Sequence, residues 1–258
     1  MSELPHGLIE GTVIERIDWT DNVFSLIVTA PINNYIAGQF TKLALQNLSG
    51  EWIRRAYSLV NSPNHKKGYQ EMEFLLITAA EGELSPRLNA LTKDDRIYVG
   101  KEACGFMTLE EIPEEAKDLW LLSTGTAIGP FLAILDEQLT QSRFENIVLV
   151  NAVRTEAELV YQSKIQALVE RYQGKLRYIP IVSRQHCARA LTGRIPALLG
   201  SGELAKKAHV KLTPENSFFY LCGNPCMVHD TSDVLIQLGY RKHLRRKAGQ
   251  YSSENYWQ

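Results

Sequence analysis

The pattern of predicted secondary structure changes near residue 115, and this change most constrains how the chain can fold. Before it, short apolar and β-branched runs are separated by turn residues such as Pro31, Gly50 and Gly68. The predicted strands are residues 8–18, 22–30, 40–46, 53–60, 71–79 and 96–99, with one helix near SPRLNALTK. Several short strands separated by turns indicate a β-barrel or a β-sandwich.

After residue 115, short apolar runs alternate with segments of helical periodicity. The predicted strands are residues 119–125, 147–153, 176–183 and 217–223, each followed by a predicted helix. The first helical stripe comprises Ile128, Phe131, Leu132, Leu135 and Leu139. This alternation indicates βαβ units on a parallel sheet, which binds ligands at the carboxyl ends of its strands.

Composition and charge narrow the classes of function. The 28 Lys and Arg residues nearly balance the 29 Asp and Glu residues, so no overall field attracts nucleic acid or a membrane. The chain begins without a signal-peptide pattern, and no apolar run is long enough for a membrane span. The four cysteines match neither a disulfide framework nor a metal-binding spacing. We therefore expect a cytoplasmic protein that binds no metal, nucleic acid or membrane.

The segment GELSPRL, residues 82–88, has two interpretations. Ser85 suits a helix N-cap and Pro86 the first helical position, so the segment could simply start a helix. Free N–H groups at a helix N-terminus can instead hold a phosphate. Arg55, in the segment RRAYSLVNSP (54–63), could complete such a site because its planar guanidinium matches phosphate oxygens. The residues alone leave both interpretations open.

Three motifs end strands of the second half. STGTAIGP (123–130) lacks the GxGxxG fingerprint, so its glycines favour either a tight turn or a closely approaching ligand. VSRQHCARALTGRIP (182–196) holds three arginines and no acid, which indicates a solvated loop or a site for the 2′-phosphate of NADP. In LCGNPCMV (221–228), Asn224 suits a helix cap, and Cys222 is either a core residue or a neighbour of a reacting ring.

Two further segments lie near the C-terminus. YRKHLRRKAG (240–249) is basic, which indicates a solvated face or a docking patch for an acidic partner. The last residues, SSENYWQ, contain two adjacent aromatic side chains. Because large aromatic surface is costly to leave in water, these side chains favour a docked tail.

The motifs RAYS, GELSPRL, TGTAIGP, VSR, LTGRIP, CGNP and YW occur together and in this order. In this respect the chain resembles the bacterial ferredoxin(flavodoxin)–NADP reductases, specifically the enterobacterial kind whose tail ends in Tyr-Trp. The resemblance implies an antiparallel β-barrel that binds FAD over residues 1–110. It further implies an α/β domain with a parallel sheet that binds NADP(H) over residues 111–258, with a C-terminal tail returning to the flavin. Gln258, after the Tyr-Trp pair, departs from the family pattern.

The resemblance also implies site residues. For FAD they are Arg55, Ala56, Tyr57, Ser58, Leu84, Ser85, Thr126, Tyr256 and Trp257. For NADP(H) they are Val153, Arg154, Ser183, Arg184, Arg194, Gly223 and Asn224. Its implied catalytic residues are Ser58 facing flavin N5, Cys222 near the nicotinamide, and Glu254 as a proton relay or an electrostatic group.

The activity implied by the resemblance is hydride transfer between nicotinamide C4 and flavin N5, followed by single-electron transfer to flavodoxin or ferredoxin. The carrier would dock on a basic face formed by Arg241, Lys242, Arg245, Arg246 and Lys247, and the enzyme would be a monomer. One alternative is an NAD(P)H-dependent flavin reductase or oxygenase reductase component on the same scaffold. A more distant alternative is a non-catalytic, flavin-binding redox sensor.

Overall fold

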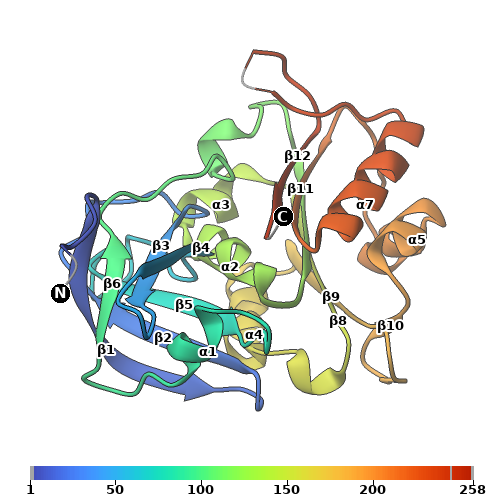
Figure 1. Ribbon diagram of the computed structural model, residues 1–258. Helices are drawn as coiled ribbons and strands as arrows, with labels where there is room; N and C mark the ends of the chain where they lie inside the picture. The colour runs from blue at the N-terminus through green and yellow to red at the C-terminus, as the bar shows by residue number, and fades with distance from the viewer. Residues whose placement is uncertain (1–2, 245, 257–258) are drawn as a thin grey trace.

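The computed structural model, which describes residues 3–244 and 246–256, contains two six-stranded sheets that lie side by side (Figure 1). The N-terminal sheet is antiparallel and has the order β4-β3-β6-β1-β2-β5. Its strands are β1 (Leu8–Asp18), β2 (Val23–Thr29), β3 (Phe40–Gln46), β4 (Trp52–Ser58), β5 (Glu71–Ile77) and β6 (Arg96–Gly100). An isolated antiparallel bridge between Leu59 and Phe74 brings the two edge strands together, so the sheet curls into a barrel. The predicted strands and the predicted barrel are confirmed.

The short helix α1 (Ser85–Asn89) follows β5, but the predicted N-cap is wrong. Leu84 occupies the N-cap position, and no side chain among the described residues caps the helix. The hydroxyl of Ser85 instead accepts a hydrogen bond from the backbone N–H of Ala79 at 3.0 Å. Ser85 is therefore used to close the loop between β5 and α1, which a local cap rule does not anticipate.

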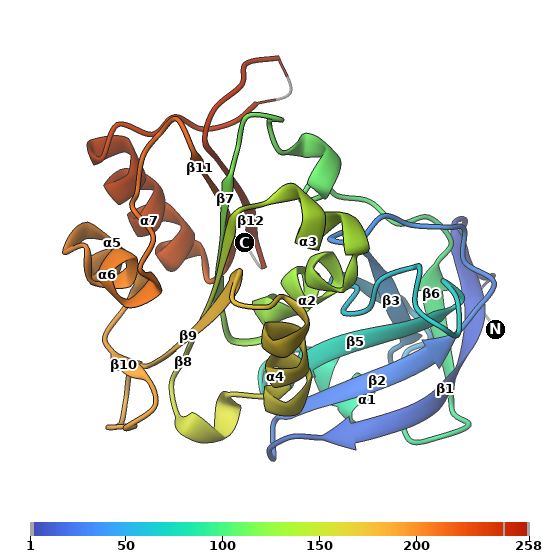
Figure 2. The ribbon, with the colours of Figure 1, turned by 180° about the vertical axis from the view of Figure 1, so that it is seen from behind.

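The C-terminal sheet is parallel and has the order β10-β9-β8-β7-β11-β12. Its strands are β7 (Asp118–Thr124), β8 (Asn146–Val153), β9 (Leu176–Val182), β10 (Leu191–Thr192), β11 (Ser217–Gly223) and β12 (Tyr251–Asn255). Its helical elements are η1 (Leu109–Glu111), η2 (Gly125–Ile128), α2 (Gly129–Asp136), α3 (Gln138–Arg143), η3 (Glu156–Glu158), α4 (Gln162–Arg171), α5 (Ile195–Gly200), α6 (Glu203–Ala208) and α7 (Pro225–Gln237). Helices α2 and α4 cover the face toward the barrel, and α5 to α7 cover the opposite face (Figure 2).

Helices after β7 and β9 are each interrupted where the sequence predicts a single helix. Glu137 is extended, with φ −72° and ψ 132°, so the stripe from Ile128 to Leu139 divides into α2 and α3. Leu139, the last member of that stripe, is consequently 59% exposed. Gly202, at φ 77°, separates α5 from α6, and its left-handed conformation favours glycine.

The C-terminal strand β12 was not predicted. It pairs in parallel with β11, which places Glu254 opposite Cys222 and Asn255 opposite Gly223. The segment Tyr251–Asn255 contains serine, glutamate and asparagine, which have weak strand preference. Pairing with the buried strand β11 overrides this local preference.

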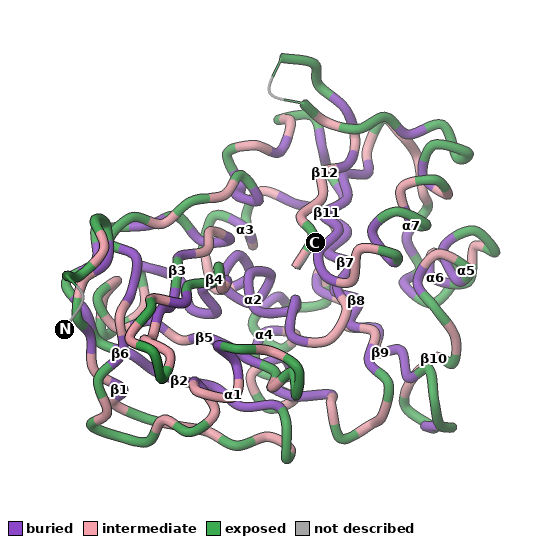
Figure 3. The backbone as a smooth tube through the Cα atoms, viewed as in Figure 1, coloured by how far each residue is buried: buried purple, intermediate pink, exposed green. Residues whose placement is uncertain are grey.

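An apolar layer joins the two halves of the molecule. Val60, Leu75 and Met107 from the N-terminal half pack in the same cluster as the residues of α2. Every residue of α2 from Gly129 to Leu135 is buried, as the purple trace shows (Figure 3). Among the described residues, no helix is both long and apolar enough to cross a bilayer.

Candidate active site

A cleft of about 400 Å³ lies over the carboxyl ends of the parallel strands. The chain reverses its direction of sheet growth at β7, with β8 on one side and β11 on the other, so the cleft lies at a topological switch point. It is lined by Ile77, Thr124, Gly125, Thr126, Ala152, Val153, Arg154, Glu158, Ser183, Gly193, Arg194, Ile195, Pro196, Asn224, Cys226, Met227 and Asp230. The position predicted from strand–helix alternation is confirmed.

The floor of the cleft is made by the close approach of two strand ends. Gly223 has φ 136°, and a Cβ atom there would lie 2.1 Å from the Thr124 hydroxyl. That hydroxyl accepts a hydrogen bond from the backbone N–H of Asn224 at 2.8 Å. Gly223 is therefore required by both backbone conformation and space. Sequence reasoning missed Thr124, whose only signal is its place directly before the glycine turn.

Two segments that start helices line the cleft, one at Asn224 and one at Gly125. The Asn224 side chain accepts hydrogen bonds from the N–H groups of Cys226 and Met227, at 2.8 and 3.4 Å. This confirms the predicted cap of α7. At the other turn, Gly125 has φ 55°, and nothing lies within 4 Å of a Cβ built on it. The space above Gly125 therefore leaves a flat ligand free to approach the backbone.

Two of the three arginines predicted to bind the coenzyme line the cleft. Arg154 and Arg194 line it with exposed side chains, and the backbone N–H of Arg184 donates to the carbonyl of Arg154 at 2.9 Å. Arg189, from the same loop, instead forms an ion pair with Glu156 at 2.9 Å. Arg154, Arg184 and Arg194 have no ion pair within the described part of the chain. Two acids, Glu158 and Asp230, also line the cleft.

Strand β4 presents a second group of predicted residues on the barrel. Arg54, Arg55 and Ala56 are exposed, Tyr57 is half-buried and Ser58 is buried. Burial raises the pKa of Tyr57 to about 12, an effect that the positive charge of Arg55 partly offsets. Tyr57 thus remains a neutral phenol. It packs against the barrel core, and Leu84, at the start of α1, belongs to that core.

The C-terminal tail connects the two groups. The backbone N–H of Tyr256 donates to the carbonyl of Gly223 at 3.0 Å, and its phenol donates to the carbonyl of Thr126 at 3.3 Å. Burial raises the pKa of Tyr256, as does the adjacent Cys222, while a hydrogen bond with Ser58 opposes the shift. Ser58 comes from the barrel, and the other residues come from the parallel sheet. Tyr256 therefore lies where the two halves meet.

Burial disfavours the charged forms of two ionisable side chains beside Tyr256. Cys222 is fully buried, and burial followed by the charge of Glu254 raises the pKa of its thiol well above the ordinary value. Burial also raises the pKa of Glu254, although the backbone N–H of Phe106, 3.4 Å from its carboxylate, offsets part of this effect. Cys222 is consequently a poor nucleophile.

The basic segment lies apart from the cleft. Arg241, Lys242, Arg246 and Lys247 are exposed in the loop before β12. The backbone of Lys242 forms an isolated parallel β-bridge with Tyr251. Tyr251 in turn pairs with Phe219, near the amino end of β11. The loop is the one at the top of Figure 1, at the opposite end of the sheet from the cleft. Arg245, Trp257 and Gln258 lie outside the described residues.

Comparisons with known proteins agree with this geometry. Residues 121–233 match the family model described as the oxidoreductase NAD-binding domain. The flavodoxin/ferredoxin–NADP reductases of Shigella flexneri and Escherichia coli (strain K12) are each 48% identical over 250 residues, covering 96% of this chain and 98% of the relative. A ferredoxin NADP+ reductase from Neisseria gonorrhoeae, crystallised with FAD and NADP, matches with a TM-score of 0.90 and 31% identity. That match covers 98% of this chain and 100% of the other.

Proposed function

Because the chain belongs to the flavodoxin/ferredoxin–NADP reductase family, we propose that it moves electrons between NADPH and a one-electron carrier protein, flavodoxin or ferredoxin. The protein is a flavoprotein oxidoreductase. Its residues fit the two cofactors: the open space above Gly125 admits a flat ligand, and exposed arginines offer charge to phosphates. Bound FAD supplies a group that accepts a hydride from the nicotinamide and releases electrons singly.

One observation carries the proposal, namely the position of Tyr256. Its side chain is near Ser58 on the barrel and contacts Thr126 on the parallel sheet. A ring in that position would lie between a flavin held by the barrel and a nicotinamide held by the cleft. We propose that Tyr256 covers the flavin and moves when the nicotinamide stacks there, which makes the tail a gate.

On the flavin side, the proposed FAD contacts are Arg55, Ala56, Tyr57, Ser58, Leu84, Ser85, Thr126, Tyr256 and Trp257. The exposed guanidinium of Arg55 would neutralise the pyrophosphate, and the uncapped N–H groups of α1 would donate to it. Tyr57, kept as a neutral phenol, would pack on the ring system. The proposed flavin region extends to residue 110, and the coenzyme region runs from 111 to 258.

On the coenzyme side, we assign binding to Val153, Arg154, Ser183, Arg184, Arg194, Gly223 and Asn224. Exposed cations without a partnered carboxylate favour the 2′-phosphate of NADPH over the ribose hydroxyl of NADH. Arg189 is not assigned this role because it forms an ion pair with Glu156. Val153 and Asn224 line the cleft, and Gly223 allows the two strand ends to approach each other.

Three residues are proposed to act at the reacting atoms. The buried Ser58 hydroxyl would hold a hydrogen bond to flavin N5. Cys222, kept as a thiol by burial, would leave a small, water-poor space for the nicotinamide ring. Glu254, whose raised pKa favours the protonated form, could hold the proton that N5 gains or loses. These roles require the tail to lie where β12 places it.

For the carrier, we propose docking on the cations Arg241, Lys242, Arg245, Arg246 and Lys247. Flavodoxins and ferredoxins are typically acidic, so a positive rim would speed and orient their approach. The cytoplasmic location and the monomeric state stay predictions.

An absorbance spectrum of the purified protein tests the proposal. We expect a yellow protein whose flavin absorbance bleaches with NADPH, bleaches slowly with NADH and returns when oxidised flavodoxin or ferredoxin is added. A protein that binds FAD but is not reduced by NADPH would support a redox sensor instead. A protein that purifies colourless and reduces added free FAD would support a flavin reductase.

A further inference from the structure

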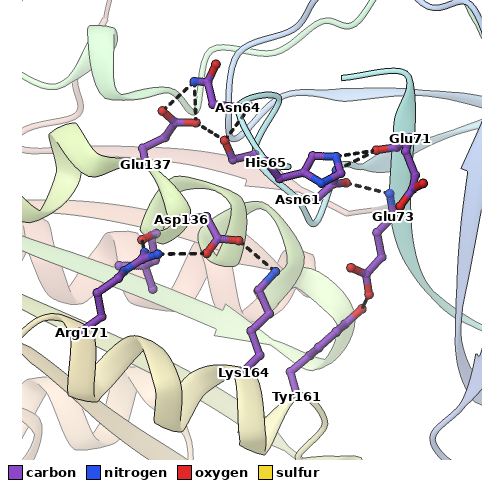
Figure 4. A network of polar contacts seen from close by, with 12 residues as sticks. Asn61, Asn64, His65, Glu71, Glu73, Asp136, Glu137, Tyr161, Lys164 and Arg171 are labelled. Carbon is purple, nitrogen blue, oxygen red and sulfur yellow. Dashed lines mark hydrogen bonds and ion pairs between the residues drawn. The ribbon is translucent and has the colours of Figure 1, made fainter. Parts of the chain in front are cut away.

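Two carboxylates bridge the halves of the molecule in opposite directions (Figure 4). Glu73, on β5 of the barrel, accepts a hydrogen bond from the Tyr161 phenol at the start of α4. Glu137, between α2 and α3, accepts from the hydroxyl of Ser62 and from the Asn64 amide, the latter at 3.0 Å. We call these five residues the inter-sheet clamp. Neither carboxylate belongs to the cofactor sites described above.

The hydrogen bonds of the first bridge all point toward Glu73. The indole N–H of Trp19 can only donate, and it lies 2.9 Å from the Ser25 hydroxyl oxygen. Tyr161 gives its single proton to Glu73, so Ser25, 2.7 Å away, must donate to the Tyr161 oxygen. Burial and the charge of Glu73 raise the pKa of Tyr161 well above its ordinary value, so the phenol remains a donor. Such an aligned chain strengthens each of its bonds.

The backbone at Tyr161 is strained. Its φ of 58° and ψ of 23° place a bulky side chain in the left-handed region, which such residues rarely adopt. This conformation lies at the N-cap of α4, and the Tyr161 ring lies 4.7 Å from that of Trp19, measured between centroids. Strain of this kind persists only where the surroundings hold it, and it clusters at functional positions.

On the barrel side, the clamp holds the chain directly after Ser58. The backbone N–H of Val60 donates to the carbonyl of Glu73 at 2.9 Å, and the Asn61 side chain accepts from the N–H of Glu73 at 2.7 Å. Glu73 thus binds the continuation of β4 through its backbone and Tyr161 through its side chain. The Ser58 position is therefore tied to α4 by a short path.

In the half that contains the parallel sheet, both bridges of the clamp are attached to α2 and α4, which ion pairs join to each other. Asp136, the last residue of α2, pairs with Lys164 at 3.0 Å and with Arg171 at 3.6 Å, both on α4. Glu137 directly follows Asp136, so both bridges belong to the same pair of helices. Helix α2 also continues directly from η2, which carries Thr126. Loss of either bridge should therefore shift Thr126 relative to Ser58.

We propose that Tyr161 and Glu137 are positioning residues for hydride transfer, which act by holding the flavin strand β4 at a fixed distance from the η2 turn. The inference rests on the proposed function. Hydride transfer needs reacting atoms about 3–3.5 Å apart, and a misplacement of about 1 Å can cost on the order of 100-fold in rate. The clamp lies outside both cofactor sites, so its loss should affect the transfer step rather than binding.

The test uses the flavin-loaded protein with Tyr161→Phe, which removes the bond to Glu73 and keeps the ring. Three quantities are measured: the single-turnover rate of flavin bleaching at saturating NADPH, the NADPH dissociation constant, and hydrogen exchange over residues 58–64 without coenzyme. We expect the rate to fall about 10- to 100-fold, NADPH affinity to stay within about threefold, and exchange over 58–64 to accelerate.

Tyr172→Phe is the matched control. The Tyr172 phenol is buried at the end of the same helix and donates to the carbonyl of Leu135 at 2.7 Å, entirely within the parallel half. This control should bleach at the wild-type rate. Equal rate losses in both variants, or wild-type rate and exchange in Tyr161→Phe, would overturn the proposal.

A second variant tests the proposal if the first one does not fold. If Tyr161→Phe does not fold, Ser62→Ala removes a donor to Glu137, and it should slow bleaching and accelerate exchange over 58–64 in the same direction, by a smaller factor. Wild-type behaviour of Ser62→Ala would then overturn the proposal. A wild-type protein that NADPH cannot reduce would refute the proposed function instead, and the exchange data alone would then decide whether the clamp exists.

Discussion

The two sides of the proposed active site are built in opposite ways. On the coenzyme side, Arg154 and Arg194 extend into an open cleft with exposed side chains. On the flavin side, Ser58 is buried beside Tyr256, and burial raises the pKa of the surrounding groups. An open, charged surface suits a ligand that must enter and leave in each cycle. A closed, aromatic surface suits a cofactor that stays bound and must be shielded from water.

The difference extends to how each side is stabilised. The coenzyme side is formed by strand ends and helix starts of the parallel sheet. Residues there, such as Gly223 and Asn224, contact residues that are near them in sequence or that end the neighbouring strand. The flavin side requires residues 58, 126, 222 and 256 to converge from separate parts of the chain. We therefore expect substitutions on the first side to change coenzyme choice, and substitutions on the second to change flavin retention or pH response.

The largest effect should come from removing both proposed phosphate contacts. Arg184→Ala with Arg194→Ala should lower kcat/KM for NADPH by about 10²- to 10⁴-fold, because each charge-assisted contact contributes about 1.5–3 kcal/mol. The kcat/KM for NADH and the yellow colour should change little. Arg189→Ala is the control and should leave both coenzymes unaffected, since Arg189 is paired with Glu156. An equal loss with NADPH and NADH would contradict the assignment of these cations.

The second effect tests the opposite side. Arg55→Ala should weaken FAD binding about 10- to 150-fold through loss of one charge-assisted phosphate contact. FAD released during dialysis, measured by fluorescence, reports this change, and the ratio of NADPH to NADH use should stay constant. Arg54→Ala is the matched control, because Arg54 is an equally exposed neighbour outside the proposed site. Equal FAD loss from both variants would mean that only the general charge of β4 matters.

A smaller effect is expected away from both cofactors. Arg246→Gln with Lys247→Gln should slow carrier reduction a few-fold at low salt, because these exposed charges steer an acidic partner. The gap from wild type should narrow above about 0.1 M salt, where the Debye length falls to roughly 10 Å. Reduction of ferricyanide by NADPH is the control and should be unchanged. Losses of equal size with both acceptors would place the segment in the fold or the cofactor site.

The smallest effect concerns Glu254. Because burial raises its pKa in the folded protein, this carboxyl stabilises the fold most below its unfolded pKa, and that contribution is lost as pH rises through the folded pKa. Glu254→Gln removes the dependence. As the pH rises from the unfolded pKa through the folded pKa of Glu254, the Tm of the variant should gain on that of the wild type, by less than about 4 °C in all. A Tm difference that is constant over this range would mean that Glu254 is not desolvated.

Much of the fold could be predicted because its signals are local. Strand runs such as 8–18 and 147–153 alternate or remain apolar over lengths that match β1 and β8. The Asn224–Pro225 start of α7 is also local, since the cap and the two N–H groups that donate to it lie within three residues. The same rule failed at Ser85, whose hydroxyl is engaged by Ala79 across a loop.

Periodicity along the chain predicted the two sheets and the strand ends that line the cleft, and composition predicted a cluster of arginines there. Three contacts could be seen only in the folded molecule: β12 pairs with β11, Tyr256 lies between Ser58 and Thr126, and Tyr161 donates to Glu73. The cause is separation along the chain. Periodicity and capping depend on neighbours a few residues apart, whereas Tyr161 and Glu73 are 88 residues apart and meet only after both halves have packed.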